Sequence, residues 1–254
     1  MEQSTNNETA ALCGVLLAAL ALGGWMAPTI VRAAELSEAQ LYFELNNTDR
    51  DLGLHSSIDG EPYVKLEIED PFGREILGIE AQRRLARQGL TQLFFESAEP
   101  SFDELSPAAF FNRFPEGIYE IEVVDEDGLE FEVEVFLSQV LAAPVGNITV
   151  NGIPAAKSCD ANVLPSVSAP VVIDWNPVTK SHPTIGKKGV VVIDQYQFFV
   201  EREGVKLSVE LPPSVTEFEV PADILALGDD FKFEIIARTA TGNNTAIETC
   251  FLLE

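Results

Sequence analysis

Two alternating runs decide the fold class of this chain: Gly117-Ile118-Tyr119-Glu120-Ile121-Glu122-Val123 and Leu129-Glu130-Phe131-Glu132-Val133-Glu134-Val135. Apolar and polar residues that alternate with a period of two are typical of a half-buried β-strand. An Asp-Gly pair between the runs is a turn signal, so the sequence predicts an antiparallel hairpin. Its outer face carries five glutamates, which are either solvated, bound to a cation, or covered by the basic segment Arg83 to Arg87.

The C-terminal half repeats this pattern in shorter runs. After residue 145, strand-like runs such as Val190 to Arg202 are separated by turn signals such as Thr241-Gly242-Asn243. Many short strands with regular turns are typical of a β-sandwich. The chain is therefore predicted to be all-β, apart from a short helix near 107–113 that Ser106 caps and Pro107 opens.

Several residues of this half resemble, in order and spacing, the fibronectin type III family. That family has a Trp ending its second strand, a Tyr in its third, and a sixth strand of aromatic and apolar residues that ends in Ala before a Gly turn. The matching positions are Trp175, Tyr196, Phe231, Phe233, Ile235, Ala237 and Gly242. The resemblance covers about residues 145–254 and implies an immunoglobulin-like sandwich. Phe231 departs from it, because the family usually has a Tyr there.

The N-terminal half carries a weaker form of the sixth-strand pattern. Phe114 to Val123 has the same order of turn, aromatic residue and alternating apolar residues as Leu227 to Ile235. We therefore expect two tandem immunoglobulin-like β-sandwiches, one at residues 34–144 and a fibronectin type III-like one at 145–254, in a bacterial-type exported protein. The alternative is that any half-buried antiparallel strand shows such a pattern.

Residues 1–33 are predicted to be a signal peptide. Ala10 to Met26 is apolar and uncharged, and the small-residue pattern Val31-Arg32-Ala33 marks a cleavage site. The segment begins with Glu2 and Glu8 instead of basic residues, so an uncleaved membrane anchor is the alternative. With cleavage, the protein is expected in the periplasm or outside the cell, with no membrane span.

Cysteine usage agrees with export. Beyond residue 33 the chain holds Cys159 and Cys250, and such a pair in an exported protein indicates one disulfide. The resemblance implies that the two positions lie at the same pole of the sandwich. The alternative is two separate buried cysteines.

The charge is strongly negative and unevenly distributed. The net charge is −25, and residues 34–145 hold 25 acidic and 7 basic residues against 14 and 8 in residues 146–254. Such a field argues against binding to nucleic acid or to an anionic membrane. We expect the acidic surface to serve solubility where salt screens its repulsion, with cation binding as the alternative.

No catalytic residue is predicted, although two acidic segments are candidate sites. Glu96, Glu99 and Asp103 could supply the paired carboxylates of a glycoside hydrolase, but such pairs are common in an acidic chain. Asn47, Asp49 and Asp51 have the spacing of a calcium loop, yet the glycine comes one place late and the distal glutamate is missing. A turn is the favoured interpretation, so no cofactor is predicted, with calcium as the alternative.

One basic loop stands out in the C-terminal half, and it contains Lys180, Lys187 and Lys188. The resemblance places this loop at the pole that faces the preceding domain. We predict that it docks against the acidic N-terminal half and limits interdomain motion. The alternative is a solvated loop.

The sequence as a whole predicts an exported, non-catalytic binding or adhesion module that contacts protein or glycan. The first alternative is a structural protein of envelope assembly with no small ligand. The second is the carboxylate-based glycoside hydrolase.

Overall fold

The computed structural model describes residues 36–254, so the predicted signal peptide and its cleavage site lie outside the described residues. Within this range almost all regular structure is β-strand, and the helices are α1 (Pro107–Arg113) and α2 (Ala222–Leu225). The prediction of an all-β chain with a short helix near 107–113 is confirmed. None of the described helices is long and apolar enough to cross a membrane.

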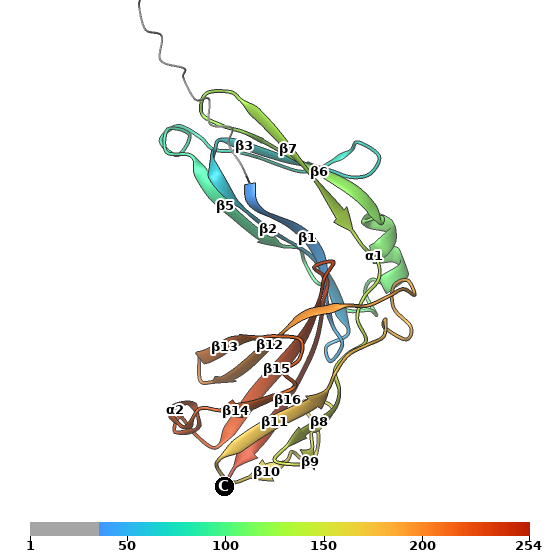
Figure 1. Ribbon diagram of the computed structural model, residues 1–254, viewed down its shortest axis with the longest axis vertical. Coiled ribbons are helices and arrows are strands. Elements are labelled where there is room, and N and C mark those ends of the chain that lie inside the picture. The colour runs from blue at the N-terminus through green and yellow to red at the C-terminus, as the bar shows by residue number, and fades with distance from the viewer. Residues whose placement is uncertain (1–35) are drawn as a thin grey trace, which may run out of the picture. The chain divides into compact units, whose positions relative to one another are not determined.

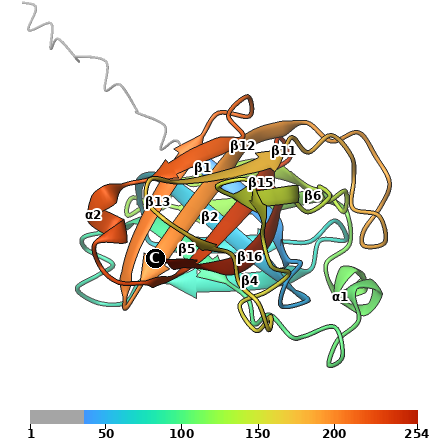
Figure 2. The same cartoon turned by 90° about the horizontal axis from the view of Figure 1, so that it is seen from below.

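The C-terminal half is a sandwich of two sheets (Figures 1 and 2). The first sheet has the order β14-β11-β8-β9 and consists of β8 (Gly146–Val150), β9 (Ile153–Pro154), β11 (Val171–Asn176) and β14 (Glu217–Val220). The second has the order β13-β12-β15-β16 and consists of β12 (Ile193–Arg202), β13 (Val205–Leu211), β15 (Asp230–Thr239) and β16 (Asn244–Leu253). This is the strand order of a fibronectin type III module, as the resemblance implied.

The residues that carried the resemblance lie in or beside this core. Trp175 packs edge-on against Tyr196 with ring centroids 5.6 Å apart, and Tyr196 Oη accepts a hydrogen bond from Val178 N at 2.8 Å. Phe231, Phe233 and Ala237 are buried in β15, and Gly242 has the positive φ that its turn requires.

The long segment between β9 and β11 is linked to the sandwich at two points. Its short strand β10 (Ser166–Val167) pairs with β16 in parallel, and Cys159 forms a disulfide with Cys250 of β16.

The N-terminal half repeats the same strand order. One sheet contains β1 (Leu36–Asn46), β2 (Asp51–Tyr63) and β5 (Leu90–Glu96) in the order β5-β2-β1. The other contains β3 (Lys65–Glu69), β4 (Glu75–Glu80), β6 (Gly117–Val124) and β7 (Glu130–Leu137) in the order β4-β3-β6-β7. When the two-residue strands β9 and β10 are set aside, the first, second and fifth strands of each half share one sheet, and the third, fourth, sixth and seventh share the other. The prediction of two tandem sandwiches is confirmed.

Each sandwich has its own hydrophobic core. The N-terminal core includes Phe43 and Tyr119, and Phe111 of α1 packs edge-on against Phe43 with centroids 5.2 Å apart. The C-terminal core includes Trp175 and Phe198.

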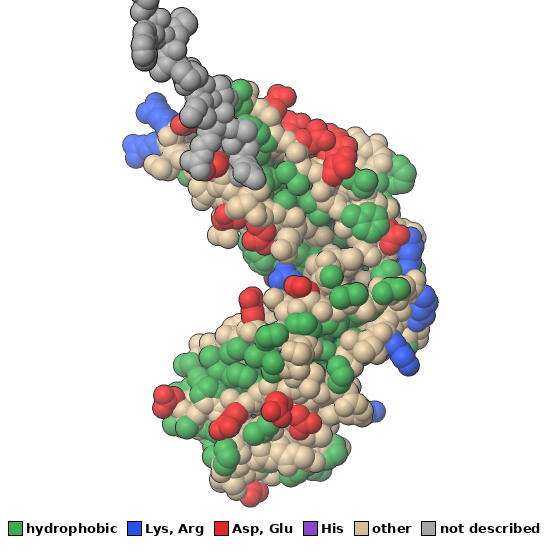
Figure 3. All heavy atoms as spheres, in the orientation of Figure 1, with side chains coloured by type: hydrophobic (Ala, Val, Ile, Leu, Met, Phe, Trp, Pro, Cys, Tyr) green, Lys and Arg blue, Asp and Glu red, His purple; other side chains and the backbone are tan. Residues whose placement is uncertain are grey.

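The predicted hairpin is formed by β6 and β7, with Glu120 opposite Glu134 and Glu122 opposite Glu132. Neighbouring β3 adds Glu67 and Glu69 to the same rows, and Figure 3 shows the acidic side chains gathered over this region. Within residues 36–254 the basic side chains of Arg83 to Arg87 form no ion pair, so they do not neutralise this face. Glu67 of this face is paired with Lys65 at 2.8 Å.

The two halves also share a sheet. The ends of β1 and β16 pair in parallel, with Glu44, Leu45 and Asn46 opposite Asn244, Thr245 and Ala246. Each strand is the edge of its own sandwich sheet, so the pairing covers two open edges at once.

Candidate functional site

The two sandwiches meet in a region that we call the junction, which comprises the connecting residues 138–145, the loop 177–190 and the turn 240–243. Leu141 of the connection belongs to the N-terminal core, whereas Ala142 belongs to the C-terminal core. Ile185 of the loop packs against the N-terminal core. The connection is therefore built into both cores.

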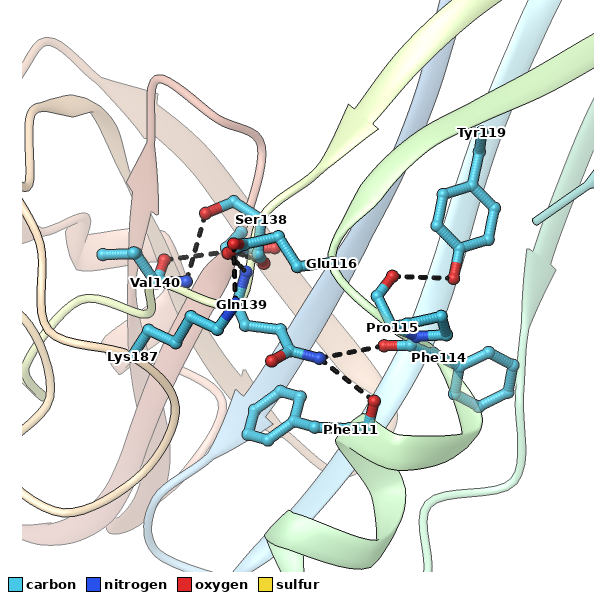
Figure 4. Close-up of polar contacts among 10 residues, drawn as sticks. Phe111, Phe114, Pro115, Glu116, Tyr119, Ser138, Gln139, Val140 and Lys187 are labelled. Atoms are coloured by element: carbon cyan, nitrogen blue, oxygen red, sulfur yellow. Dashed lines mark hydrogen bonds and ion pairs between the residues drawn. The ribbon is translucent and has the colours of Figure 1, made fainter. Parts of the chain in front are cut away.

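Gln139 anchors the beginning of the connection to the N-terminal sandwich (Figure 4). Its Nε2 donates hydrogen bonds to the carbonyl oxygens of Phe111 at 3.0 Å and Phe114 at 3.1 Å, and its backbone N donates to Glu116 Oε2 at 2.9 Å. These partners lie in the last turn of helix α1 or directly after it, so the connection is held where that helix ends.

Glu116 joins this anchor to the basic loop. Lys187 Nζ donates to Glu116 Oε1 at 2.8 Å, and Lys187 N donates to Gln139 O at 2.7 Å. Burial raises the pKa of Glu116, but the hydrogen bonds from Lys187 and Gln139 outweigh it and leave the pKa lowered. The carboxylate is therefore charged and bonded at both oxygens.

The other residues of the basic loop have different roles. Lys188 Nζ donates to the carbonyl oxygens of His182 and Pro183, so it closes its own loop. Lys180 contributes its backbone oxygen to Ala143 N at 2.8 Å, and its side chain forms no ion pair with any described residue. The structure thus brings one of the three lysines, Lys187, to an acidic group of the other sandwich.

Asn243 connects the turn 240–243 to both strand β1 and the connection. Its Nδ2 donates to Ser138 O at 2.8 Å and Val140 O at 3.1 Å, and its Oδ1 accepts from Phe43 N at 2.9 Å. The residue is 0% exposed. A buried side-chain amide with three partners holds its neighbours in one arrangement, since each lost bond leaves a buried polar group unpaired.

A groove of about 500 Å³ opens beside the junction. Both sandwiches contribute to its lining, which includes Gln40, Phe136, Asp194, Gln195 and the segment Arg238–Gly242. Phe136 is 53% exposed although it is aromatic. Arg238 Nη2 donates to Gln40 Oε1 at 3.0 Å and its guanidinium lies over the ring of Tyr42, so these two polar side chains of the groove hold one another in place.

The three calcium candidates lie in and after the turn between β1 and β2, and their contacts are separate. Asn47 Oδ1 is 3.2 Å from His182 Nε2, and Asp49 Oδ2 accepts from Asn46 Nδ2 at 3.3 Å. Asp51 begins β2, where its Oδ1 is buried without a hydrogen-bond partner among the described residues.

Two of the three carboxylates proposed for catalysis converge, and they do so on a histidine. We call His55, Glu96 and Glu99 the His55 group: one potential ligand atom from each lies within 4.8 Å of the others. His55 Nε2 is 3.0 Å from Glu99 Oε1. Asp103 is exposed and lies outside the group.

The backbone explains how Glu99 reaches His55. Residues Glu96 and His55 are cross-strand partners in β5 and β2, and beyond β5 Ser97 exchanges hydrogen bonds with Leu54 at 2.9 Å. Glu99 then lies above Gly53, where an added Cβ would be 2.2 Å from Glu99 Oε1. The missing side chain at Gly53 therefore provides the space for the contact.

The surroundings of the His55 group are negatively charged. Burial, together with the nearby carboxylates of Glu99 and Asp49, raises the pKa of Asp51 to about 6. Burial lowers the pKa of His55, but the contact with Glu99 and the field of Glu44 outweigh it, so the net shift is upward. Such groups can exchange protons near neutral pH or hold a cation.

Sequence reasoning missed His55 and Asn243. His55 lies 44 residues before Glu99, and Asn243 lies more than 100 residues from Ser138, so no local spacing connects them. The signal that was available is the glycine pattern, because Gly53 interrupts an otherwise β-forming strand and marks a close approach.

Comparisons with known proteins add the following. No protein-family model and no curated protein matches the sequence. The chain is similar to a two-domain fibronectin type III segment of chicken tenascin, with 13% identity, a TM-score of 0.29, and coverage of 86% of this chain and 97% of that one.

It is also similar to the FN1–FN3 domains of chicken CNTN1, with 11% identity, a TM-score of 0.34 and coverage of 84% and 66%. A tetra-tandem repeat of a large adhesion protein has 13% identity, a TM-score of 0.26 and coverage of 88% and 50%. At such scores the fold assignment rests on the strand order and the two cores of this chain.

Proposed function

We propose that this chain is an exported, non-catalytic interaction module that binds an extracellular protein or glycan in the groove beside the junction. The observation that carries the proposal is that both sandwiches line the groove, while the junction holds them together. Ligand sites occur preferentially at such domain interfaces. The disulfide and the predicted signal peptide support an extracellular location.

The chemistry of the groove fits a polar ligand with flat apolar faces. An exposed aromatic ring offers a surface for stacking, and the side chains of Gln40, Asp194, Gln195 and Arg238 offer hydrogen-bond donors and acceptors. A sugar ring or an extended peptide with an aromatic residue has both features. The basic loop also supports the proposal. Its Lys187 pairs with Glu116 and so helps to fix the connection between the two sandwiches that line the groove.

The test is a binding screen of the full-length chain, prepared from an exporting host, on arrays of glycans and extracellular proteins. Saturable binding that Phe136→Ala weakens at least about tenfold would support the groove as the site. Phe72→Ala is the matched control, since Phe72 is 70% exposed and does not line the groove. Binding that both variants reduce equally, or no binding to either array, would contradict the proposal.

A second candidate function, glycoside hydrolysis, is favoured by one observation, namely the approach of Glu96 and Glu99 to one another. Glycosidases use two carboxylates on opposite sides of the scissile bond. Incubation with a panel of aryl glycosides distinguishes the two functions. Turnover that Glu99→Gln abolishes would replace the interaction module with an enzyme.

A further inference from the structure

The His55 group lies on the opposite sandwich sheet from the acidic hairpin and shares no residue with the groove. Its composition differs from that of an ordinary acidic surface, because its nitrogen donor is a buried imidazole. His55 is 4% exposed, and its ring lies between Tyr42, at 5.4 Å between centroids, and Phe94, at 6.3 Å. These rings fix its orientation toward Glu99.

We propose that His55, Glu96 and Glu99 bind a divalent transition metal ion, with Zn²⁺ as the ion of best fit. One imidazole nitrogen and two carboxylate oxygens are a donor set that Zn²⁺ accepts, whereas Ca²⁺ and Mg²⁺ take oxygen ligands. Tetrahedral ligands about 2 Å from zinc are ~3.3 Å apart, and His55 Nε2 and Glu99 Oε1 are 3.0 Å apart. Three protein ligands leave a fourth position open.

Glu96 completes the set by a side-chain rotation. It is exposed, and its ligand atom lies within 4.8 Å of the other two, so a rotation about its flexible bonds brings it into range. The strand pairing already fixes its backbone opposite His55. No change in the sheet is needed for the ion to bind.

Gly53 makes the space for this group. A Cβ at position 53 would be 2.2 Å from Glu99 Oε1 and 2.9 Å from His55 Nε2. A glycine that leaves the area above it free for two ligand atoms has a role that strand formation does not explain, since Gly weakens a strand.

The neighbouring charges favour a cation over a simple ion pair. Asp49, Asp51 and Glu44 all act on this region, and Asp51 Oδ1 is a buried oxygen without a hydrogen-bond partner among the described residues. A protonated His55 contributes one positive charge, whereas a bound divalent ion contributes two. The repulsion among these closely spaced carboxylates is relieved more by the bound divalent ion.

The test is a titration of the full-length chain with Zn²⁺ at neutral pH by isothermal calorimetry, together with thermal unfolding in excess Zn²⁺. We expect one site per chain and a rise of Tm with Zn²⁺ but not with Ca²⁺. His55→Gln and Glu99→Gln should each weaken binding by at least about tenfold. Gly53→Ala should do the same while leaving all three ligands in the chain, because its Cβ displaces the Glu99 carboxylate.

Asp103→Asn is the matched control, since it also removes one carboxylate from the same acidic segment but lies outside the group. If Asp103→Asn weakens Zn²⁺ binding as much as Glu99→Gln, the binding is a general property of the negative surface and the site does not exist. If the wild-type chain shows no saturable binding, the His55–Glu99 contact is an ordinary hydrogen bond and the proposal is wrong. Either result leaves the groove unaffected, because its variants involve other residues.

Discussion

The two sandwiches have the same strand order but are stabilised by different devices. The C-terminal one carries the Cys159–Cys250 disulfide, and Phe231 of β15 stacks on Phe251 with ring centroids 5.2 Å apart. The N-terminal one has no cysteine, and its sixth strand carries Tyr119, whose hydroxyl donates to Pro115 O at 3.0 Å. That hydrogen bond is a tyrosine corner, which the C-terminal sandwich lacks. The same topology is therefore stabilised by a disulfide in one sandwich and by a side-chain hydrogen bond in the other.

The largest expected effect comes from the disulfide. Its two cysteines are 91 residues apart, so removing it with Cys159→Ser and Cys250→Ser should destabilise the C-terminal sandwich by about 3–5 kcal/mol. Urea unfolding monitored by the fluorescence of Trp175 checks this, because the other tryptophan, Trp25, lies in the predicted signal peptide. Reduction should lower the free energy of unfolding of the wild type and leave that of the double variant unchanged. An equal loss of hydrogen-exchange protection in both sandwiches would contradict the prediction that the disulfide stabilises mainly the C-terminal one.

The second effect concerns the coupling between the sandwiches. Asn243→Ala removes three buried hydrogen bonds and should cost about 2–3 kcal/mol. Calorimetry should then resolve two unfolding transitions where the wild type has one. Asn151→Ala is the control inside one sandwich, because Asn151 also makes three hydrogen bonds, to Ser168, Pro170 and Val172, but at an exposed position where their loss should cost less. If both variants keep a single transition, Asn243 does not couple the halves.

The third effect is a pH dependence in the shared sheet. The pKa of Glu234 is raised to about 7, mainly by burial and also by the carboxylates of Glu44 and Glu248, while Lys206 and Lys232 partly oppose the shift. Because the folded-state pKa lies above the unfolded value, the contribution of Glu234 to stability is present below about pH 4.5 and is lost as the pH rises through about 7.

Glu234→Gln should therefore stabilise the protein by about 1–3 kcal/mol above pH 7 and have little effect below pH 4.5. Chemical unfolding across this pH range measures it. Glu132→Gln, on the exposed acidic face of the N-terminal sandwich, should show no such pH profile. Identical profiles for the two variants would mean that net charge, and not the shared sheet, sets the dependence.

The smallest loss of stability is expected when the hydrogen bond of the tyrosine corner is removed. Tyr119→Phe removes the hydrogen bond to Pro115 O and should cost about 1 kcal/mol, mostly in the N-terminal sandwich. Tyr63→Phe is the control in the same core, since the hydroxyl of Tyr63 is buried without a hydrogen-bond partner among residues 36–254. Its loss should be neutral or slightly stabilising. Equal destabilisation by both substitutions would argue against a specific role for the corner.

Much of the architecture was predictable because it is local. The period-two runs in β6 and β7 place Tyr119 and Ile121 inside and Glu120 outside whatever the rest of the chain does. The capping of α1 by Ser106 depends on three neighbouring residues. The candidate site was only half predictable, because the acidic segment contains Glu96 and Glu99 but says nothing about the histidine that joins them.

The sequence by itself determined the hairpin strands β6 and β7, most strands of the C-terminal half, the helix at Pro107 and the pair of cysteines available for a disulfide. Each of these depends on residue period, on capping chemistry or on the count of one residue type. The tertiary structure alone decided the pairing of β1 with β16, the three hydrogen bonds of Asn243 and the approach of Glu99 to His55. These contacts join groups that are 44 to 200 residues apart, so they arise from the packing of whole sheets and leave no periodic trace in the chain.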